Sequence, residues 1–225
     1  MGERINLNTA GTHCIGAYLA KPVGDPKGGL VVVQEIFGVT PHIRDVADRF
    51  AEAGYTAVAP AFFDYVENDV ELGYDRAGME RGKSLAMEVG LDRAVEAVAS
   101  AADSIKSSGR IGVVGYCWGG TVALLSAQRL GLPAVSYYGA RNTAYFEQPL
   151  KAPVIFHFGE TDKSIPPGAV EKHRKAWPDA PVYVYEGAGH AVNRDVDPTH
   201  YNEPGAELAW QRTLAFFDRH LAGEA

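Results

Sequence analysis

Short apolar runs alternate along this chain with longer stretches of helical period, and this alternation restricts the fold more than any other feature. The clearest runs are residues 30–34, 55–59, 111–115, 134–138, 153–158 and 182–185. Several are rich in Val, Ile and Tyr, as strands that are covered on both faces usually are. The pattern predicts an α/β fold with a mostly parallel central sheet and helices on both faces.

Three stretches between the strands place apolar residues on one face of a helix. In the first, Thr40 is the expected N-cap and Pro41 lies in the first turn, with the helix ending near Gly54. The apolar positions are Ile43, Val46, Ala47 and Phe50; Leu91, Ala94, Val95, Val98, Ala102 and Ile105; and Trp210, Leu214, Phe217 and Leu221. Residues 62–87 lack this regularity, so we expect loops and a short helix there, over one end of the sheet.

Composition limits the size and the class of the protein. A chain of 225 residues with 46% hydrophobic residues suits a single domain spanning residues 1–225, and it contains no repeat or linker. The net charge of -7 disfavours nucleic acid as a partner. Neither a signal sequence nor a membrane span is apparent, which favours a cytoplasmic location.

Both cysteines, Cys14 in an N-terminal strand and Cys117, are expected to be free thiols. The oligomeric state stays open.

A cysteine stands where a strand is predicted to turn into a helix. Gly115, Cys117 and Gly119 form a G-x-C-x-G pattern at that junction. Such a pattern is typical of a nucleophile elbow, in which flanking glycines let strand and helix pass closely and helix amides point at the catalytic atom. The N–H of Trp118 is the expected first oxyanion donor. The alternative is a small buried cysteine at a tight turn.

An acid and a histidine follow in the order that this kind of elbow requires. Asp162 comes just after the strand at 153–158, and His190 lies in a glycine-rich segment after the strand at 182–185. Together with Cys117 they would form a Cys-His-Asp triad. The alternatives are a turn-forming aspartate and a surface histidine. His157 lies inside an apolar strand and is expected to be a core residue, and no histidine has metal-ligand spacing, so neither metal nor cofactor is expected.

A carboxylate ends the most apolar strand. Glu35 follows four consecutive apolar residues and Gln34, where an unpaired charge would be costly. In a hydrolase of this fold the strand end faces the elbow, and the next amide, that of Ile36, is placed to be the second oxyanion donor. Glu35 can therefore reach the active site, or it forms an ion pair with a nearby arginine.

Five segments together resemble the dienelactone hydrolase family, also called the carboxymethylenebutenolidase family, of α/β-hydrolases. They are residues 34–38 (QEIFG), 115–120 (GYCWGG), 136–139 (SYYG), 159–162 (GETD) and 189–194 (GHAVNR). The resemblance covers nearly the whole chain. The cysteine elbow combined with the Glu-Ile-Phe-Gly segment is specific, whereas either alone indicates only the wider superfamily.

The resemblance implies roles for individual residues. Cys117, His190 and Asp162 would be the triad, and the amides of Ile36 and Trp118 the oxyanion hole. Glu35 would hold the resting thiol and help to deprotonate it when substrate enters. Arg194 would bind a carboxylate on the substrate, aided by a second arginine from the irregular region. Candidates for that second arginine are Arg81 and Arg76, and Phe37 and Tyr138 are further expected substrate contacts.

The activity implied by the resemblance is hydrolysis of a small lactone or ester. The expected substrate is a carboxylate-bearing enol lactone, a dienelactone, of the kind formed in the degradation of aromatic compounds, opened through a thioester acyl-enzyme. Trp118 is bulkier than the aliphatic residue expected after the nucleophile, so the substrate can differ. Two alternatives stay open, namely a broader carboxylesterase or thioesterase of the same fold, and a non-catalytic protein that binds a small ligand.

Overall fold

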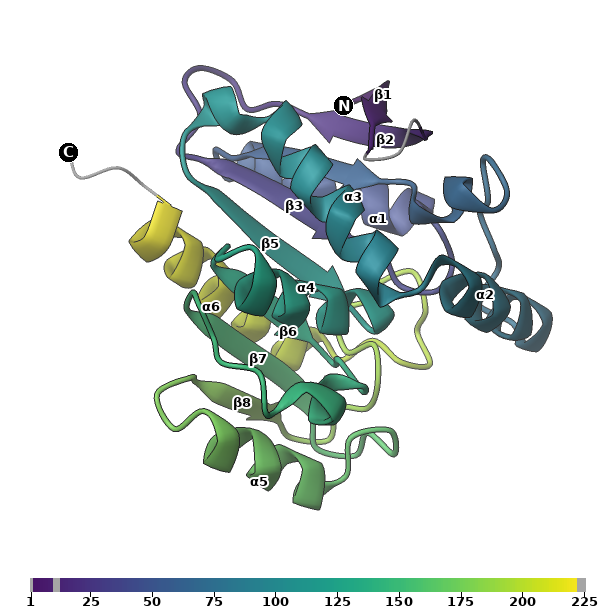
Figure 1. Cartoon of the computed structure of the whole chain (residues 1–225). Helices are drawn as coiled ribbons and strands as arrows, with labels where there is room; N and C mark the ends of the chain where they lie inside the picture. The colour runs from purple at the N-terminus through teal and green to yellow at the C-terminus, as the bar shows by residue number, and fades with distance from the viewer. Residues whose placement is uncertain (1, 10–12, 222–225) are drawn as a thin grey trace.

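A single sheet of eight strands organises the molecule. The computed structural model describes residues 2–9 and 13–221, and in it the strand order is β1-β2-β4-β3-β5-β6-β7-β8 (Figure 1). The strands are β1 (Glu3–Asn8), β2 (Cys14–Ala20), β3 (Gly29–Val33), β4 (Thr56–Pro60), β5 (Ile111–Tyr116), β6 (Ala134–Tyr137), β7 (Val154–Gly159) and β8 (Val182–Tyr185).

The sheet is parallel from β4 to β8 and antiparallel at its N-terminal edge. Strands β4, β3, β5, β6, β7 and β8 run parallel, whereas β2 pairs antiparallel with both β1 and β4. All six predicted strands are confirmed, as is the placement of Cys14 in a strand. Strand β1 was not predicted, because it is short and largely exposed, with Arg and Asn at alternate positions.

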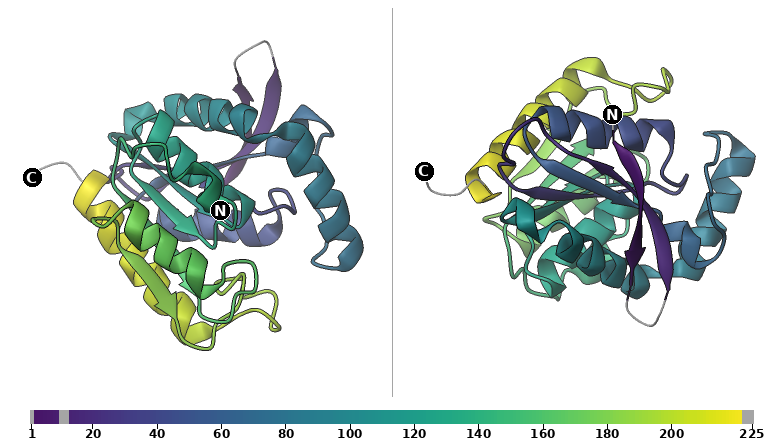
Figure 2. Two further views of the ribbon diagram at one scale, coloured as in Figure 1. Left: turned by 60° about the horizontal axis from the view of Figure 1, so that its bottom comes forward. Right: turned by 90° about the horizontal axis from the view of Figure 1, so that it is seen from above.

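Helices cover both faces of the sheet, as the alternation predicted. Figures 1 and 2 show α3 (Leu91–Ser104), α4 (Trp118–Arg129) and α5 (Pro167–Ala176) on one face and α1 (Pro41–Glu52) and α6 (Glu203–Leu221) on the other. The start of α1 is confirmed, since the Thr40 hydroxyl accepts a hydrogen bond from the Ile43 amide at 3.4 Å. Within the described residues, no helix is long and apolar enough to span a membrane.

Residues 62–87 contain more helix than expected. A 3₁₀ turn at Phe62–Tyr65 precedes α2 (Arg76–Val89), a helix of 14 residues, so the prediction of only a short helix was wrong. Asp75 caps α2 by accepting a hydrogen bond from Gly78 N at 2.7 Å. The inner face of α2 includes Gly82, where an added Cβ would lie 1.8 Å from the Ile36 carbonyl oxygen. Because α2 packs closely through glycine backbone atoms, its sequence lacks the regular apolar stripe from which a long helix is predicted.

The aromatic contact between α1 and α6 is expected to carry much of the stability of that face. Phe50 is fully buried and its ring lies 4.6 Å from that of Trp210 and 6.2 Å from that of Phe217. Phe50→Ala should lower the free energy of unfolding by about 3–5 kcal/mol, because burial is lost and a cavity remains. Denaturant titration measures this loss. The exposed Leu208→Ala on α6 is the control, with an expected change under about 0.5 kcal/mol, and an equal loss in both variants would contradict the prediction.

Candidate active site

Cys117 occupies a strained turn between β5 and α4. Its backbone has φ 56° and ψ −115°, a left-handed φ that costs a residue with a side chain about 1–3 kcal/mol. The turn is fixed on both sides, because the Cys117 amide donates to the Tyr137 carbonyl at 3.0 Å and the Cys117 carbonyl accepts from Gly120 N at 3.0 Å. The residue is partly exposed and its thiol is free. The strained turn therefore presents the thiol at the carboxyl end of the parallel strands.

Two glycines make this turn sterically possible. A Cβ on Gly115 would lie 1.8 Å from the Gly119 carbonyl oxygen, and one on Gly119 would lie 2.5 Å from the Gln34 carbonyl oxygen. Both approaches are to backbone atoms that cannot rotate away. Helix α4 can thus begin against β3 and β5 only with glycine at these positions, as the elbow pattern predicted.

Asp162 and His190 meet beside the elbow. Asp162 follows β7 and is buried, and its Oδ2 lies 2.7 Å from Nδ1 of His190, which comes after β8. The other carboxylate oxygen accepts a hydrogen bond from Ser164 N at 2.8 Å, which fixes the acid in its turn. Because Nδ1 is engaged by the carboxylate, Nε2 is the ring nitrogen left for the thiol. Asp162 and Cys117 are thus the two side-chain partners of His190, and these are the three residues predicted from the sequence to form the triad.

The two partners of His190 favour its protonated form. Burial by itself lowers the pKa of His190, but hydrogen bonds to Asp162 and Cys117 and the negative charge of both groups outweigh it. The net result raises the pKa of His190 from 6.5 to about 10. At neutral pH the imidazole therefore carries a proton that it can later give to a leaving group.

Tyr138 lies behind the histidine and is fully buried. Its ring packs edge-on against that of His190, with centroids 4.8 Å apart, and its hydroxyl donates a hydrogen bond to Asn193. Its backbone has a left-handed φ of 38° at the end of β6. Its ring also lies 6.3 Å from that of Tyr116 and 6.1 Å from that of Tyr137, so Tyr138 connects the histidine loop to the core under β5 and β6.

The two amides expected to form an oxyanion hole belong to Trp118 and Ile36. Trp118 is the first residue of α4, where the backbone N–H has no partner within the helix. Its indole is buried and packs edge-on against Phe62 at 5.6 Å. Ile36 follows β3 and is covered by α2 at Gly82. The bulk of Trp118 is therefore accommodated against the 3₁₀ turn that begins at Phe62.

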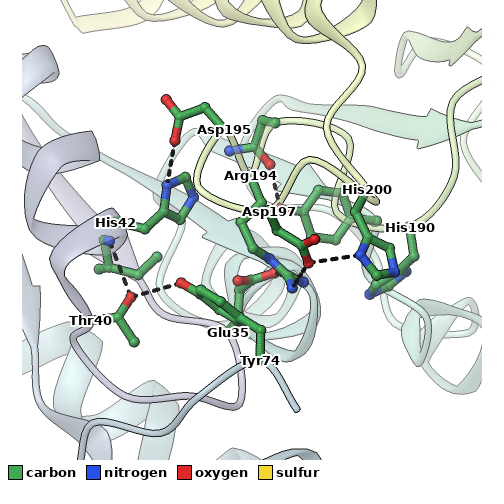
Figure 3. A network of polar contacts seen from close by, with 12 residues as sticks. Glu35, Thr40, His42, Tyr74, His190, Arg194, Asp195, Asp197 and His200 are labelled. Atoms are coloured by element: carbon green, nitrogen blue, oxygen red, sulfur yellow. Dashed lines mark hydrogen bonds and ion pairs between the residues drawn. The ribbon is translucent and has the colours of Figure 1, made fainter.

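Glu35 and Arg194 form a buried ion pair (Figure 3). Arg194 Nη2 donates to Glu35 Oε1 at 3.2 Å, and both residues are almost fully buried. This is the ion-pair alternative that the sequence left open for Glu35. Burial opposes the charge on Arg194, but the neighbouring Glu35 carboxylate outweighs it and raises the pKa of the guanidinium. Arg194 is therefore a permanent cation in the loop that begins at His190.

Further groups surround the Arg194 guanidinium. Its carbon lies 4.4 Å from the ring centroid of Tyr74 and 5.3 Å from that of Phe37. Nη1 donates to Asp197 Oδ2 at 3.1 Å, and the same oxygen lies 2.8 Å from Nδ1 of His200. The expected substrate contact Phe37 thus touches the expected carboxylate-binding arginine.

The loop that carries Arg194 is tied to α1. Asp195 accepts from Arg49 at 3.2 Å, and its other oxygen lies 3.2 Å from Nδ1 of the buried His42 (Figure 3). These contacts fix the segment after His190 to α1, which lies on the face of the sheet opposite to α4. Sequence reasoning missed Asp195 and Asp197; the only available signal was two acids closely following Arg194.

The two arginines proposed from the irregular region lie on α2 and are exposed. Arg81 pairs with Glu67, and Arg76 pairs with Glu80 at 2.9 Å within the helix. Within residues 2–9 and 13–221, neither guanidinium contacts Arg194, Cys117 or His190.

His157 is a core residue, as predicted. It is fully buried, with Nδ1 2.6 Å from the Tyr185 hydroxyl and Nε2 3.1 Å from the Thr213 hydroxyl. Burial lowers the pKa of His157 to about 3, so the ring is neutral. No group of three or more His, Cys, Asp and Glu that could hold a metal ion occurs in the described part of the chain.

The protonation of His190 can be measured directly. Since its folded pKa is raised, the ring should stay protonated from pH 6.5 to beyond pH 8 and lose its proton only as the pH approaches about 10. The associated stability is fully present below pH 6.5 and is lost as the pH rises through about 10. NMR titration of the imidazole checks this. Asp162→Asn should lower the midpoint, and a midpoint near 6.5 in the unaltered protein would contradict the assignment.

Comparisons with known proteins identify the family of this chain. The model of the "Dienelactone hydrolase family" matches residues 15–221. A protein of Yersinia pestis, provisionally named carboxymethylenebutenolidase, is 33% identical over 257 residues, covering 96% of this chain and 91% of its own. A protein of Azospirillum brasilense with the same provisional name is 35% identical, covering 96% of this chain and 98% of its own.

A solved structure extends the similarity to three dimensions. A provisionally named dienelactone hydrolase from Klebsiella pneumoniae superimposes with a TM-score of 0.84 at 29% identity, covering 98% of this chain and 99% of its own. The mostly parallel sheet, the helices on both faces and this superposition confirm the predicted α/β-hydrolase fold. With a family match over almost the whole chain and relatives above 30% identity, this protein is a hydrolase that belongs to the dienelactone hydrolase family.

Proposed function

We propose that this protein hydrolyses small carboxylate-bearing enol lactones through a Cys117-His190-Asp162 triad, by way of a thioester acyl-enzyme. The observation that carries the proposal is the 2.7 Å contact of the buried Asp162 carboxylate with the His190 ring, together with the thiol at the strained elbow that raises the pKa of that ring. The order of the three residues along the chain is that of α/β-hydrolases. The names of the relatives are consistent with this reaction class.

In the first step, the Cys117 thiolate attacks the lactone carbonyl carbon while the proton resides on His190 Nε2. A C–S bond forms, and the negative charge on the carbonyl oxygen is stabilised by the amides of Trp118 and Ile36. Each such donor contributes about 3 kcal/mol to the transition state. The ring C–O bond then breaks, and the departing enolate takes the proton from His190.

In the second step, water hydrolyses the thioester. The neutral His190 accepts a proton from the attacking water, whose oxygen bonds to the acyl carbon. The C–S bond breaks and the thiolate returns beside the protonated imidazole. The carboxylate of Asp162 maintains the ring orientation throughout, since its contact with Nδ1 is independent of the reacting atoms.

Arg194 is the proposed contact for the substrate carboxylate. Its guanidinium is charged, and it is held near the triad by the loop that begins at His190. Glu35, which contacts Arg194, would be released to act on the thiol when a substrate carboxylate takes its place. Phe37 would contribute an apolar wall beside the same site. Such a site needs no cofactor, and we propose that it serves small molecules in the cytoplasm.

A second candidate is a broader carboxylesterase or thioesterase using the same triad. The observation in its favour is that Arg194 is already paired with two carboxylates, those of Glu35 and Asp197. A substrate without a carboxylate would leave these pairs in place. Comparing esters with and without a neighbouring carboxylate separates the two candidates.

The proposal is tested by following dienelactone hydrolysis spectroscopically. Cys117→Ala should lower kcat by roughly 10⁴-fold or more, because the covalent route is lost. Asp162→Asn should lower kcat by roughly 10²-fold to 10⁴-fold, because the ring of His190 loses its orienting carboxylate. Cys14→Ala, which changes the other thiol, is the matched control and should leave kcat unaltered.

Full turnover by Cys117→Ala would refute the triad. If the unaltered protein fails to hydrolyse dienelactones but hydrolyses simple esters in a manner that depends on Cys117, the broader esterase is correct. If the protein does not hydrolyse esters and Cys117 does not react with a thiol reagent at neutral pH, the protein is a ligand-binding member of its family.

A further inference from the structure

Three strained backbone turns lie at the candidate triad. Left-handed φ values among the described residues other than glycine occur at Asp69 (57°), Cys117 (56°), Tyr138 (38°) and Ala191 (61°). Cys117 follows β5, Tyr138 follows β6, and Ala191 follows His190. For a bulky side chain such as tyrosine this conformation is a true outlier. Because such outliers persist only where their surroundings enforce them, and cluster at active sites, the strain at Tyr138 indicates a functional use of its side chain.

The hydroxyl of Tyr138 needs a hydrogen-bond acceptor, and Asn193 supplies it. Tyr138 is fully buried, and its amide donates to the His157 carbonyl at 2.8 Å. Burial raises the pKa of Tyr138 well above its ordinary value, so the hydroxyl keeps its proton throughout the neutral range and remains a donor. The carboxamide oxygen of Asn193 accepts that proton in a hydrogen bond. Without this acceptor a buried hydroxyl would be left unsatisfied, which is costly.

The same tyrosine ring contacts the candidate base, so the contacts close a loop. The rings of Tyr138 and His190 pack edge-on, with centroids 4.8 Å apart and planes at 60°. Asn193 lies only three residues after His190. The turn between them contains the left-handed Ala191 and is closed by a hydrogen bond from the Arg194 amide to the Ala191 carbonyl at 3.0 Å. This turn brings the Asn193 side chain to the tip of the ring against which His190 packs.

The imidazole needs a second restraint besides Asp162. The carboxylate holds one ring atom, Nδ1, at 2.7 Å. A single hydrogen bond fixes the position of that atom but leaves the ring free to turn about the axis of the bond. The Tyr138 ring, packed against the imidazole, blocks that rotation on one side. The direction in which Nε2 points therefore depends on both neighbours, and proton exchange with Cys117 requires Nε2 within hydrogen-bond reach of the thiol.

We propose that Asn193 is a positioning residue for His190 and acts through Tyr138. By accepting the hydrogen bond of the tyrosine it fixes the aromatic ring, and the ring in turn holds the imidazole on Asp162 with Nε2 toward the thiol. The consequence for turnover rests on the proposed function, whereas the restraint on the ring does not. Tyr138, which the sequence suggested as a substrate contact, acts here through His190, in keeping with its complete burial.

NMR spectroscopy of the Nδ1 proton of His190 tests the restraint without turnover. In the unaltered protein this proton is held by Asp162 and should give a sharp low-field resonance. Asn193→Ala removes the acceptor, and Tyr138→Phe removes the donor while keeping the ring. In both variants the resonance should broaden or disappear, because the imidazole then samples other orientations and its proton exchanges with water. A resonance as sharp in both variants as in the unaltered protein would overturn the proposal, whether or not Cys117 is the nucleophile.

The kinetic arm measures hydrolysis of 4-nitrophenyl acetate. Asn193→Ala and Tyr138→Phe should each lower kcat by roughly tenfold to hundredfold with little change in KM, because a misdirected imidazole slows the chemistry rather than substrate binding. The double variant should be no slower than either single variant, since both changes remove one contact. Losses that multiply in the double variant would overturn the proposal. Absence of hydrolysis by the unaltered protein would count against the proposed function alone, and the resonance would still decide the restraint.

Asn202→Ala is the matched control, since it makes the same substitution in the same loop. The side-chain oxygen of Asn202 accepts a hydrogen bond from Gly205 N at 2.9 Å, at the start of α6, and not from Tyr138. This variant loses a hydrogen bond of the loop, so it reports a merely structural effect. It should leave both the His190 resonance and kcat unaltered. An equal loss in Asn202→Ala would show a general loosening of the loop and would overturn the proposal.

Discussion

The left-handed backbone of Cys117 is the constraint on which the site depends. A non-glycine residue remains at φ 56° only when its surroundings enforce it, and here the enforcement is the close passage of α4 over β5 and β3. Gly115 and Gly119 permit that passage because any Cβ would meet backbone atoms. The same turn places the first amides of α4 beside the thiol. The packing of one helix on a sheet therefore determines both the position of the thiol and its electrostatic environment.

Charges from distant parts of the chain complete the site. Asp162, after β7, and His190, after β8, are joined by a 2.7 Å contact, while Glu35 at the end of β3 is joined to Arg194 in the loop that follows His190. That loop is also fixed to α1 through Asp195. Because breaking a buried pair leaves an uncompensated charge, these contacts oppose movement of the loop and so maintain the position of the histidine.

The sequence was sufficient to predict the parallel sheet, the elbow and the segments in which Asp162 and His190 meet, because each produces a local pattern: apolar runs, glycine spacing, or an acid directly after a strand. It was insufficient where contacts are non-local. The length of α2 escaped prediction because its inner face packs through Gly82 rather than through an apolar stripe. The pairing of Asp197 with the buried Arg194 could not be foreseen, because it depends on how the loop after His190 folds.

The most direct test of the account is the intact mass of the protein quenched during turnover. Opening a lactone releases no leaving group at the acylation step, so a thioester intermediate should add the full mass of the substrate. We expect that adduct in the unaltered protein, on the peptide containing Cys117, with loss of the adduct in Cys117→Ala. An adduct on another residue, or burst kinetics with no adduct on Cys117, would contradict the proposed nucleophile.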